Sequence, residues 1–139
     1  MNYGFVRVAA VTPEMRVADV PFNTQTIIKK IKDCSEKGVQ LIVFPELCIS
    51  GYTCSDLFFQ PVLLEACKSA LKQIVRETES CGALCFVGLP FAYNGKIYNV
   101  AAAFCNGKLL GLVPKQNLPN YNEFYEARHF STMPEGESV

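Results

Sequence analysis

The chain has little histidine and no closely spaced cysteine pair, so it offers no pattern for a zinc site. His129 is its only histidine, and the nearest two cysteines, Cys81 and Cys85, are too far apart to form a Cys-x-x-Cys pair. Zinc sites need clusters of cysteine and histidine at short, regular spacings. We therefore expect no metal to be bound by this chain.

The sequence also lacks an excess of one charge and a long apolar run. Thirteen Lys and Arg residues balance 13 Asp and Glu residues, and no long basic run is present, which argues against nucleic acid and anionic membranes as partners. No stretch reaches the ~20 apolar residues of a membrane span. The N-terminal apolar run carries Arg7, unlike a signal peptide. These absences predict a cytoplasmic protein.

What the sequence does contain is enough apolar material for an ordered core. Half of its 139 residues are hydrophobic, which is typical of one globular domain or part of one. Most of the seven cysteines lie within apolar stretches. We interpret them as small buried hydrophobic residues in a reducing compartment, not as disulfide partners.

The order of apolar patterns predicts a sheet that begins parallel. A strand at residues 5–11, a helix from a cap at Asn23 to about Lys37 and a strand at residues 39–44 form a βαβ unit. The second of these strands is apolar on both faces, as in parallel sheets covered by helices. A loop at residues 45–59 with a turn of helix near Asp56, a helix at residues 61–80 and a strand at residues 83–89 are predicted to follow.

Two Asn-Gly pairs indicate that the rest of the sheet is antiparallel. Asn94-Gly95 and Asn106-Gly107 bracket a strand at residues 97–105, and a further strand follows at residues 109–113. Asn-Gly is the strongest short signal for a β-hairpin. The predicted fold class is therefore α/β with a mixed sheet, followed by a long loop from residue 114.

Two charged residues directly follow strands that are predicted to be buried. Glu46 follows the strand at residues 39–44, and Lys115 follows the strand at residues 109–113. Open α/β sheets collect their catalytic groups at the carboxyl ends of strands. Glu46 is a candidate general base and Lys115 a candidate oxyanion stabiliser. The alternatives are a helix cap or loop ion pair for Glu46 and a solvated surface charge for Lys115.

Three further residues carry weaker signals. Glu126 lies in an aromatic-rich loop, where a charge is more often a loop anchor than a catalyst. His129 stands alone, and the sequence positions no partner that would make it part of a catalytic dyad. Cys48, two residues after Glu46, is either a nucleophile or a packed thiol, and the packed thiol is the more common case.

These residues match a known family. The chain resembles the nitrilase (carbon–nitrogen hydrolase) superfamily, and within it the N-terminal glutaminase domains of glutamine-dependent NAD synthetases. The resemblance covers essentially the whole chain. It is carried by Leu41-Ile42-Val43-Phe44-Pro45-Glu46-Leu47-Cys48-Ile49-Ser50-Gly51-Tyr52, Asp56-Leu57-Phe58, Pro114-Lys115, Leu118-Pro119-Asn120-Tyr121, Glu123-Phe124-Tyr125-Glu126 and Arg128.

The resemblance implies a role for five of these residues. Glu46 would be the general base, acting first on a cysteine thiol and later on water, and Lys115 would stabilise the tetrahedral intermediate. Glu126 would orient the lysine or the substrate, and Tyr52 and Tyr121 would line the pocket. Glutamine would be the substrate, and its ammonia would pass to a synthetase domain of the same polypeptide. That domain would use ATP and magnesium to convert deamido-NAD to NAD.

The sequence departs from the family in two respects. The family's nucleophilic cysteine follows the lysine, but here no cysteine follows Cys105, and no glycine- and serine-rich phosphate loop is present. We expect residues 1–139 to be an incomplete glutaminase domain without its synthetase domain, the first half of an α-β-β-α sandwich. Such a half would expose a sheet face and strand edges, which favours association, and we expect a homo-oligomer.

The isolated chain is accordingly predicted to be inactive, with no nucleophile and no cofactor of its own. Two alternatives stay open at this point. The chain could come from a nitrilase-type amidase that acts on another small amide. It could instead be a non-catalytic half-domain that binds a partner.

Overall fold

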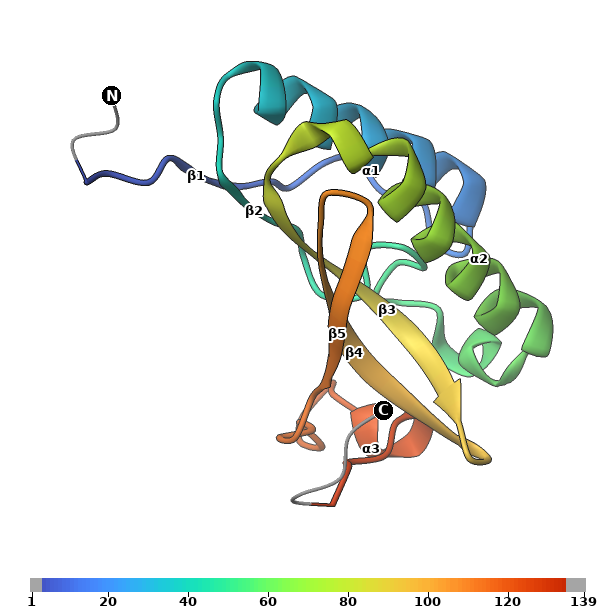
Figure 1. Cartoon of the computed structure of the whole chain (residues 1–139). Coiled ribbons are helices and arrows are strands. Elements are labelled where there is room, and N and C mark those ends of the chain that lie inside the picture. Colours follow the sequence, from blue (N-terminus) through green and yellow to red (C-terminus); the bar gives the residue numbers. More distant parts are fainter. Residues whose placement is uncertain (1–3, 135–139) are drawn as a thin grey trace.

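The computed structural model describes residues 4–134 and has two long helices beside a five-stranded sheet (Figure 1). The ends of the predicted domain, residues 1–3 and 135–139, lie outside the described residues. The predicted α/β fold class is confirmed. The elements are β1 (Val8–Ala10), α1 (Val20–Glu36), β2 (Leu41–Val43), η1 (Ser55–Phe59), α2 (Pro61–Glu77), η2 (Glu79–Cys81), β3 (Leu84–Tyr93), β4 (Lys96–Cys105), β5 (Lys108–Pro114) and α3 (Glu126–His129).

The sheet has the strand order β1-β2-β3-β4-β5 and is mixed, as predicted. β1, β2 and β3 are parallel to one another, whereas β3, β4 and β5 pair antiparallel through two hairpins. The turn residues Asn94 and Gly95 have φ angles of 48° and 73°, and Asn106 and Gly107 have 48° and 71°. Positive φ at both positions matches the right-handed twist of the flanking strands, which is why Asn-Gly specifies these turns.

The predicted start of the first helix was wrong. Asp19, not Asn23, caps α1, since the side chain of Asp19 accepts a hydrogen bond from the Phe22 N–H at 3.1 Å. Pro21 in the first turn fits this start, because proline lacks the N–H that would be unpaired there. Asn23 is fully buried inside α1, and its amide donates to the backbone oxygens of Arg16 and Ile49.

Other boundaries also differ from the prediction: β1 and β2 are shorter than the strands expected at residues 5–11 and 39–44, and α2 ends at Glu77 and not at residue 80. The third strand was expected to end at residue 89, but β3 continues to Tyr93, because the turn at Asn94 and Gly95 pairs its last residues with β4. Pro90 lies within that strand and made the apolar pattern look complete one residue earlier. The loop after β5 contains one helical turn, α3. The turn of helix near Asp56 is confirmed as η1.

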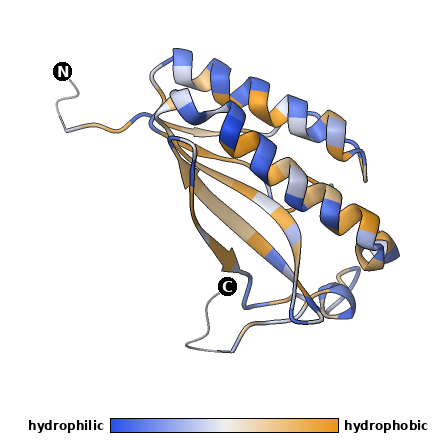
Figure 2. Ribbon diagram, turned by 45° about the vertical axis from the view of Figure 1, so that its right-hand side comes forward, coloured by the Kyte–Doolittle hydropathy of each residue, from blue (hydrophilic) through white to orange (hydrophobic). Residues whose placement is uncertain are grey.

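α1 and α2 cover one face of the sheet and form the core with it (Figure 2). Ile27 and Ile31 of α1 and Ile74 of α2 are fully buried, as are Ile42 and Leu89 of the sheet. All seven cysteines are free, and four of them are buried: Cys48, Cys54, Cys67 and Cys85. Their packing matches the interpretation as small hydrophobic residues. None of the helices within residues 4–134 has the length and apolar character to cross a membrane.

The opposite face of the sheet is apolar and open. Val43 pairs with Phe86, and Ala101 pairs with both Gly88 and Val113, so these side chains share one face in adjacent rows. Val43 is 44% exposed and Val113 is 60% exposed. Within residues 4–134 the expected helical cover is found on one face of β2 only, and the open face agrees with the expectation of an uncovered sheet face. This open face is where the candidate site lies.

Candidate active site

Glu46 reaches the open face because β3 has a glycine where the chain leaves β2. A Cβ on Gly88 would lie 2.3 Å from the Leu47 backbone nitrogen, closer than non-bonded atoms pack, and 3.1 Å from the Glu46 Cα, an unusually tight contact. Leu47 adopts a positive φ of 52°, which is rare for a leucine. The Ile49 N–H then donates to the Gly88 oxygen at 3.1 Å and fixes the segment on β3. Strained backbone of this kind is concentrated at functional sites.

Lys115 is positioned by the register of the last hairpin. Its N–H donates to the Asn99 oxygen at 2.8 Å, directly after Val100 pairs with Pro114. Lys115 and Asn99 are thus cross-strand neighbours on the open face. The sequence did not predict Asn99 as a site residue, and its one signal is a polar side chain inside an otherwise apolar strand.

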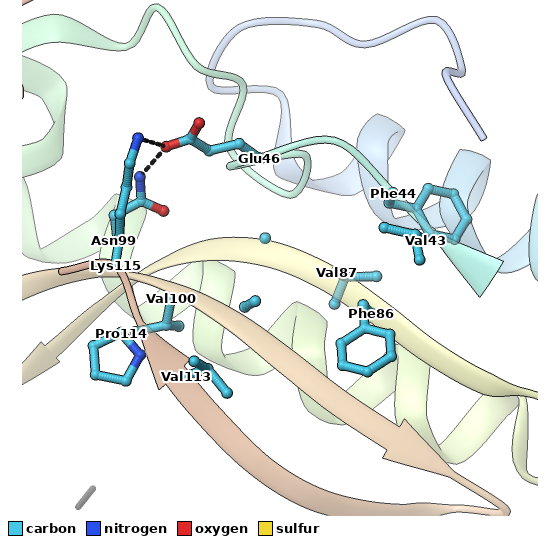
Figure 3. A pocket seen from close by; sticks show the side chains of 12 residues that line it. Val43, Phe44, Glu46, Phe86, Val87, Asn99, Val100, Val113, Pro114 and Lys115 are labelled. Atoms are coloured by element: carbon cyan, nitrogen blue, oxygen red, sulfur yellow. Dashed lines mark hydrogen bonds and ion pairs between the residues drawn. The ribbon is translucent and has the colours of Figure 1, made fainter. Parts of the chain in front are cut away.

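The side chains of Glu46, Asn99 and Lys115 converge (Figure 3). The Lys115 Nζ lies 2.8 Å from the Glu46 Oε1, and the Asn99 amide donates to the same oxygen. The Lys115 Nζ also lies 3.1 Å and 3.0 Å from the two carboxylate oxygens of Glu126. Tyr52 donates its hydroxyl to the Glu126 Oε1 at 2.7 Å. Four of the five predicted site residues are therefore in one hydrogen-bonded group.

Exposure differs sharply between the two carboxylates that flank the lysine. The Glu126 side chain is 6% exposed, whereas Glu46 is 40% exposed and Lys115 is 30% exposed. Glu126 belongs to the framework, because a buried carboxylate is stable only with its partners in place. Glu46 keeps an open side that a reacting group could approach.

The electrostatics keep the lysine charged. Burial alone lowers the pKa of Lys115, but the hydrogen bonds and charges of Glu46 and Glu126 outweigh it, and the net pKa is raised. Burial, and then the hydrogen bond and charge of Glu126, raise the pKa of Tyr52. At neutral pH the site therefore holds an ammonium group and a neutral phenol that donates to Glu126.

The group borders a cavity of about 550 Å³ on the open sheet face. Apolar side chains form most of its wall, and the polar groups gather at one end (Figure 3). A few convergent polar groups in an apolar hollow are typical of a site for a small molecule. The lining residues are Val43, Phe44, Glu46, Phe86, Val87, Gly88, Asn99, Val100, Ala101, Val113, Pro114 and Lys115.

Three other candidates lie outside this group or have structural roles. Tyr121 is largely exposed and packs edge-on against Phe124, with ring centroids 5.7 Å apart. His129 lies between aromatic rings, and its Nε2 is 3.2 Å from Asp56. Cys48 is buried against Gly88, and burial raises the pKa of its thiol to about 12. Cys48 is therefore a packed thiol and not a poised nucleophile.

The described part of the chain, residues 4–134, contains no group of three or more His, Cys, Asp or Glu side chains that could hold a metal ion. The charged side chains nearest the cavity bind one another instead. A carboxylate with an ammonium beside it can move protons and stabilise an oxyanion.

Comparison with known sequences identifies the family. The sequence profile described as carbon-nitrogen hydrolase matches residues 7–138. The chain belongs to the carbon–nitrogen hydrolase family. This confirms the resemblance seen in the sequence motifs.

The relatives of this carbon–nitrogen hydrolase chain are longer proteins. A glutamine-dependent NAD(+) synthetase from Mycobacterium tuberculosis is 40% identical over 130 residues, which are 94% of this chain and 19% of the relative. Another from Aquifex aeolicus is 42% identical over 114 residues, which are 82% of this chain and 20% of the relative. The chain thus spans about a fifth of the length of these relatives.

Solved structures show the same fold. A glutamine-dependent NAD(+) synthetase from Cytophaga hutchinsonii matches with a TM-score of 0.89 and 28% identity, over 96% of this chain and 23% of that one. An amidase from Nesterenkonia sp. matches with a TM-score of 0.77 and 25% identity, over 94% of this chain and 49% of that one. The carbon–nitrogen hydrolase fold is therefore common to synthetases and simple amidases.

Proposed function

We propose that this chain supplies the general base and the oxyanion-stabilising lysine of a glutamine amide hydrolase. The observation that carries the proposal is the 2.8 Å contact between the Lys115 Nζ and the Glu46 Oε1 at one end of the cavity. A base and an ammonium that share one site are the two groups that amide hydrolysis needs besides a nucleophile.

The proposed reaction runs in two steps. Glu46 takes the proton of a cysteine thiol as the sulfur attacks the amide carbon of glutamine, and Lys115 stabilises the oxyanion. Glu46 then gives its proton to the leaving ammonia, and a thioester forms. In the second step Glu46 takes a proton from water as the water oxygen attacks the thioester. The C–S bond then breaks, glutamate is released, and Glu46 returns its proton to the leaving thiolate.

The cysteine in this scheme is not among residues 1–139, whose last cysteine is Cys105. Cys48 cannot replace it, because its protonated thiol is buried under the same segment that carries Glu46. We therefore expect the 139-residue chain alone to release no ammonia from glutamine. Measurable turnover by the purified chain would contradict this assignment.

The names of the relatives support a wider role. As part of a glutamine-dependent NAD synthetase, the site would supply ammonia to a synthetase domain that uses ATP and magnesium to amidate deamido-NAD. A homo-oligomeric, cytoplasmic enzyme is our expectation for the whole protein. The similarity to a Nesterenkonia amidase leaves another small amide as the second candidate substrate.

The test is to express the complete coding sequence and assay NAD formation with glutamine or with ammonia. We expect Glu46→Gln and Lys115→Ala to abolish the glutamine-dependent reaction and to leave the ammonia-dependent reaction intact, since free ammonia bypasses the hydrolase site. Lys108→Ala, at the other end of β5, is the matched control and should change neither reaction. Equal loss of both reactions in Glu46→Gln would contradict the proposed role.

A further inference from the structure

α3 carries the buried carboxylate of the site, yet it is too short to hold its own position. It has four residues, and its hydrogen bonds include the Phe130 N–H to the Glu126 oxygen at 2.9 Å. A single helical turn is unstable by itself, because nucleation of a helix costs more than one hydrogen bond returns. Contacts with the rest of the protein must therefore fix where Glu126 points.

Those contacts come mainly from the segment at residues 52–59, which contains η1. On one side Tyr52 donates to Glu126 at 2.7 Å. On the other side Asp56 accepts two hydrogen bonds from Arg128, from Nε at 2.9 Å and from Nη2 at 2.8 Å. The same two segments are thus joined at two points, with Glu126 and Arg128 only two residues apart.

Aromatic packing joins the same two segments next to the ion pair. The ring of Phe58 lies 4.9 Å from that of Phe130 and 5.6 Å from that of His129. The His129 Nε2 also lies 3.2 Å from the Asp56 Oδ1. Asp56 is therefore the common partner of two consecutive residues of α3.

The exposed ion pair between Asp56 and Arg128 has a geometry that can fix the orientation of α3. Exposed ion pairs usually stabilise a protein little, but a bidentate Arg–carboxylate pair fixes orientation as well as distance. Hydrogen bonds from Arg128 and His129 lower the pKa of Asp56 to about 2. Asp56 is consequently charged throughout the range in which an enzyme would work.

We propose that Asp56 and Arg128 are positioning residues that orient Glu126 toward Lys115, and so place the ammonium group for the reaction. The proposal rests on the proposed function in one respect: the reaction it serves is the hydrolysis of an amide at Glu46 and Lys115. Neither Asp56 nor Arg128 touches the cavity described above. They act through α3.

The kinetic test uses Asp56→Asn in the product of the complete coding sequence, which keeps the side-chain shape and removes the charge. We expect kcat for glutamine hydrolysis to fall about tenfold, with KM changed less than about twofold, because the loss concerns an interaction made in the transition state. Ammonia-dependent NAD formation should not change. Glu77→Gln, which removes a carboxylate on α2 that accepts from Gln73, is the control and should keep the wild-type kcat.

Exchanging the charges of Asp56 and Arg128 distinguishes loss of their ion pair from nonspecific damage to the fold. The double variant Asp56→Arg/Arg128→Asp should recover most of the kcat that Asp56→Arg and Arg128→Asp lose singly. A double variant as slow as the single ones, or Asp56→Asn with the wild-type kcat, would overturn the proposal.

Hydrogen exchange of backbone amides tests the positioning role of Asp56 without relying on the proposed enzymatic function. In Asp56→Asn the amides of Glu126 and Phe130 should exchange faster, while those of β3 and β4 keep their wild-type rates. Unchanged exchange at both amides would overturn the positioning role. Absence of glutamine hydrolysis by the wild-type protein, with faster exchange in the variant, would instead contradict the proposed function alone.

Discussion

At the scale of single residues, Gly88 is what allows the Glu46 side chain to lie on the open face of the sheet. The chain after β2 passes so close to β3 that no side chain fits between Gly88 and the backbone of Glu46 and Leu47. This close approach is achieved without a positive φ at the glycine, so space and not backbone freedom is the reason for glycine here.

Gly88→Ala should therefore destabilise the protein by about 1–3 kcal/mol, the usual cost of forcing extra atoms into a packed site. The added methyl group would push Leu47 away and break the Ile49 N–H bond to the Gly88 oxygen. Urea denaturation measures the loss. Gly111→Ala is the matched control, because a Cβ on Gly111 meets nothing within 4 Å. Equal stability of the two variants would contradict this account.

The sequence singled out Glu46 and Lys115 because a charge directly after an apolar strand is visible in the pattern itself, and the structure brings the two side chains together. Their catalytic roles stay predictions. The prediction of Glu126 as a site residue was weaker and depended on the family resemblance, because only tertiary contacts bury this side chain. Of the two alternatives for Cys48, a nucleophile or a packed thiol, the structure supports the packed thiol, because the side chain is buried. The nature of a side chain at a strand end is thus readable from the sequence, whereas burial in a loop is not.

At the scale of elements, the Asn-Gly turns fixed the hairpins but not the register beyond them. Counting back from Asn106 and Gly107 places Asn99 opposite Pro114. A bulge shifts the pairing, so that Phe104 faces Leu109 but Ala103 faces Gly111. Asn99 therefore lies beside Lys115. One unpaired residue, which no turn signal reveals, decides which side chains meet in the site.

The start of the first helix also depends on a detail that the sequence pattern did not reveal. Asp19 is the N-cap of α1, whereas Asn23, the predicted cap, is buried within the helix. Asp19→Ala should destabilise the protein by about 1 kcal/mol, while Asp19→Asn should have little effect, because asparagine caps as well as aspartate. Asn23→Ala should cost more than Asp19→Ala, since it leaves the buried oxygen of Ile49 without its donor. Thermal or urea unfolding of the three variants checks the order. The reverse order would contradict the larger structural role assigned to the buried hydrogen bonds of Asn23.

At the scale of the whole molecule, one face of the sheet completes the core, whereas the other is left open to association. The covered face packs against α1 and α2 and completes a core, as the sequence periodicity predicted. The open face presents Val43, Phe86 and Val113 around the cavity. An exposed apolar surface of this kind is a site of association, because its burial removes contact with water.

The 139-residue chain on its own should therefore self-associate as its concentration rises. Val113→Lys should shift this equilibrium toward monomer, because a charge on the open face would have to be desolvated in the associated state. Val62→Lys is the matched control, since Val62 is 76% exposed on α2 and lies away from the cavity. Sedimentation velocity over a range of concentrations measures both. If the chain stays monomeric throughout, or if Val62→Lys weakens association as much as Val113→Lys, then the open face is not the surface through which the chain associates.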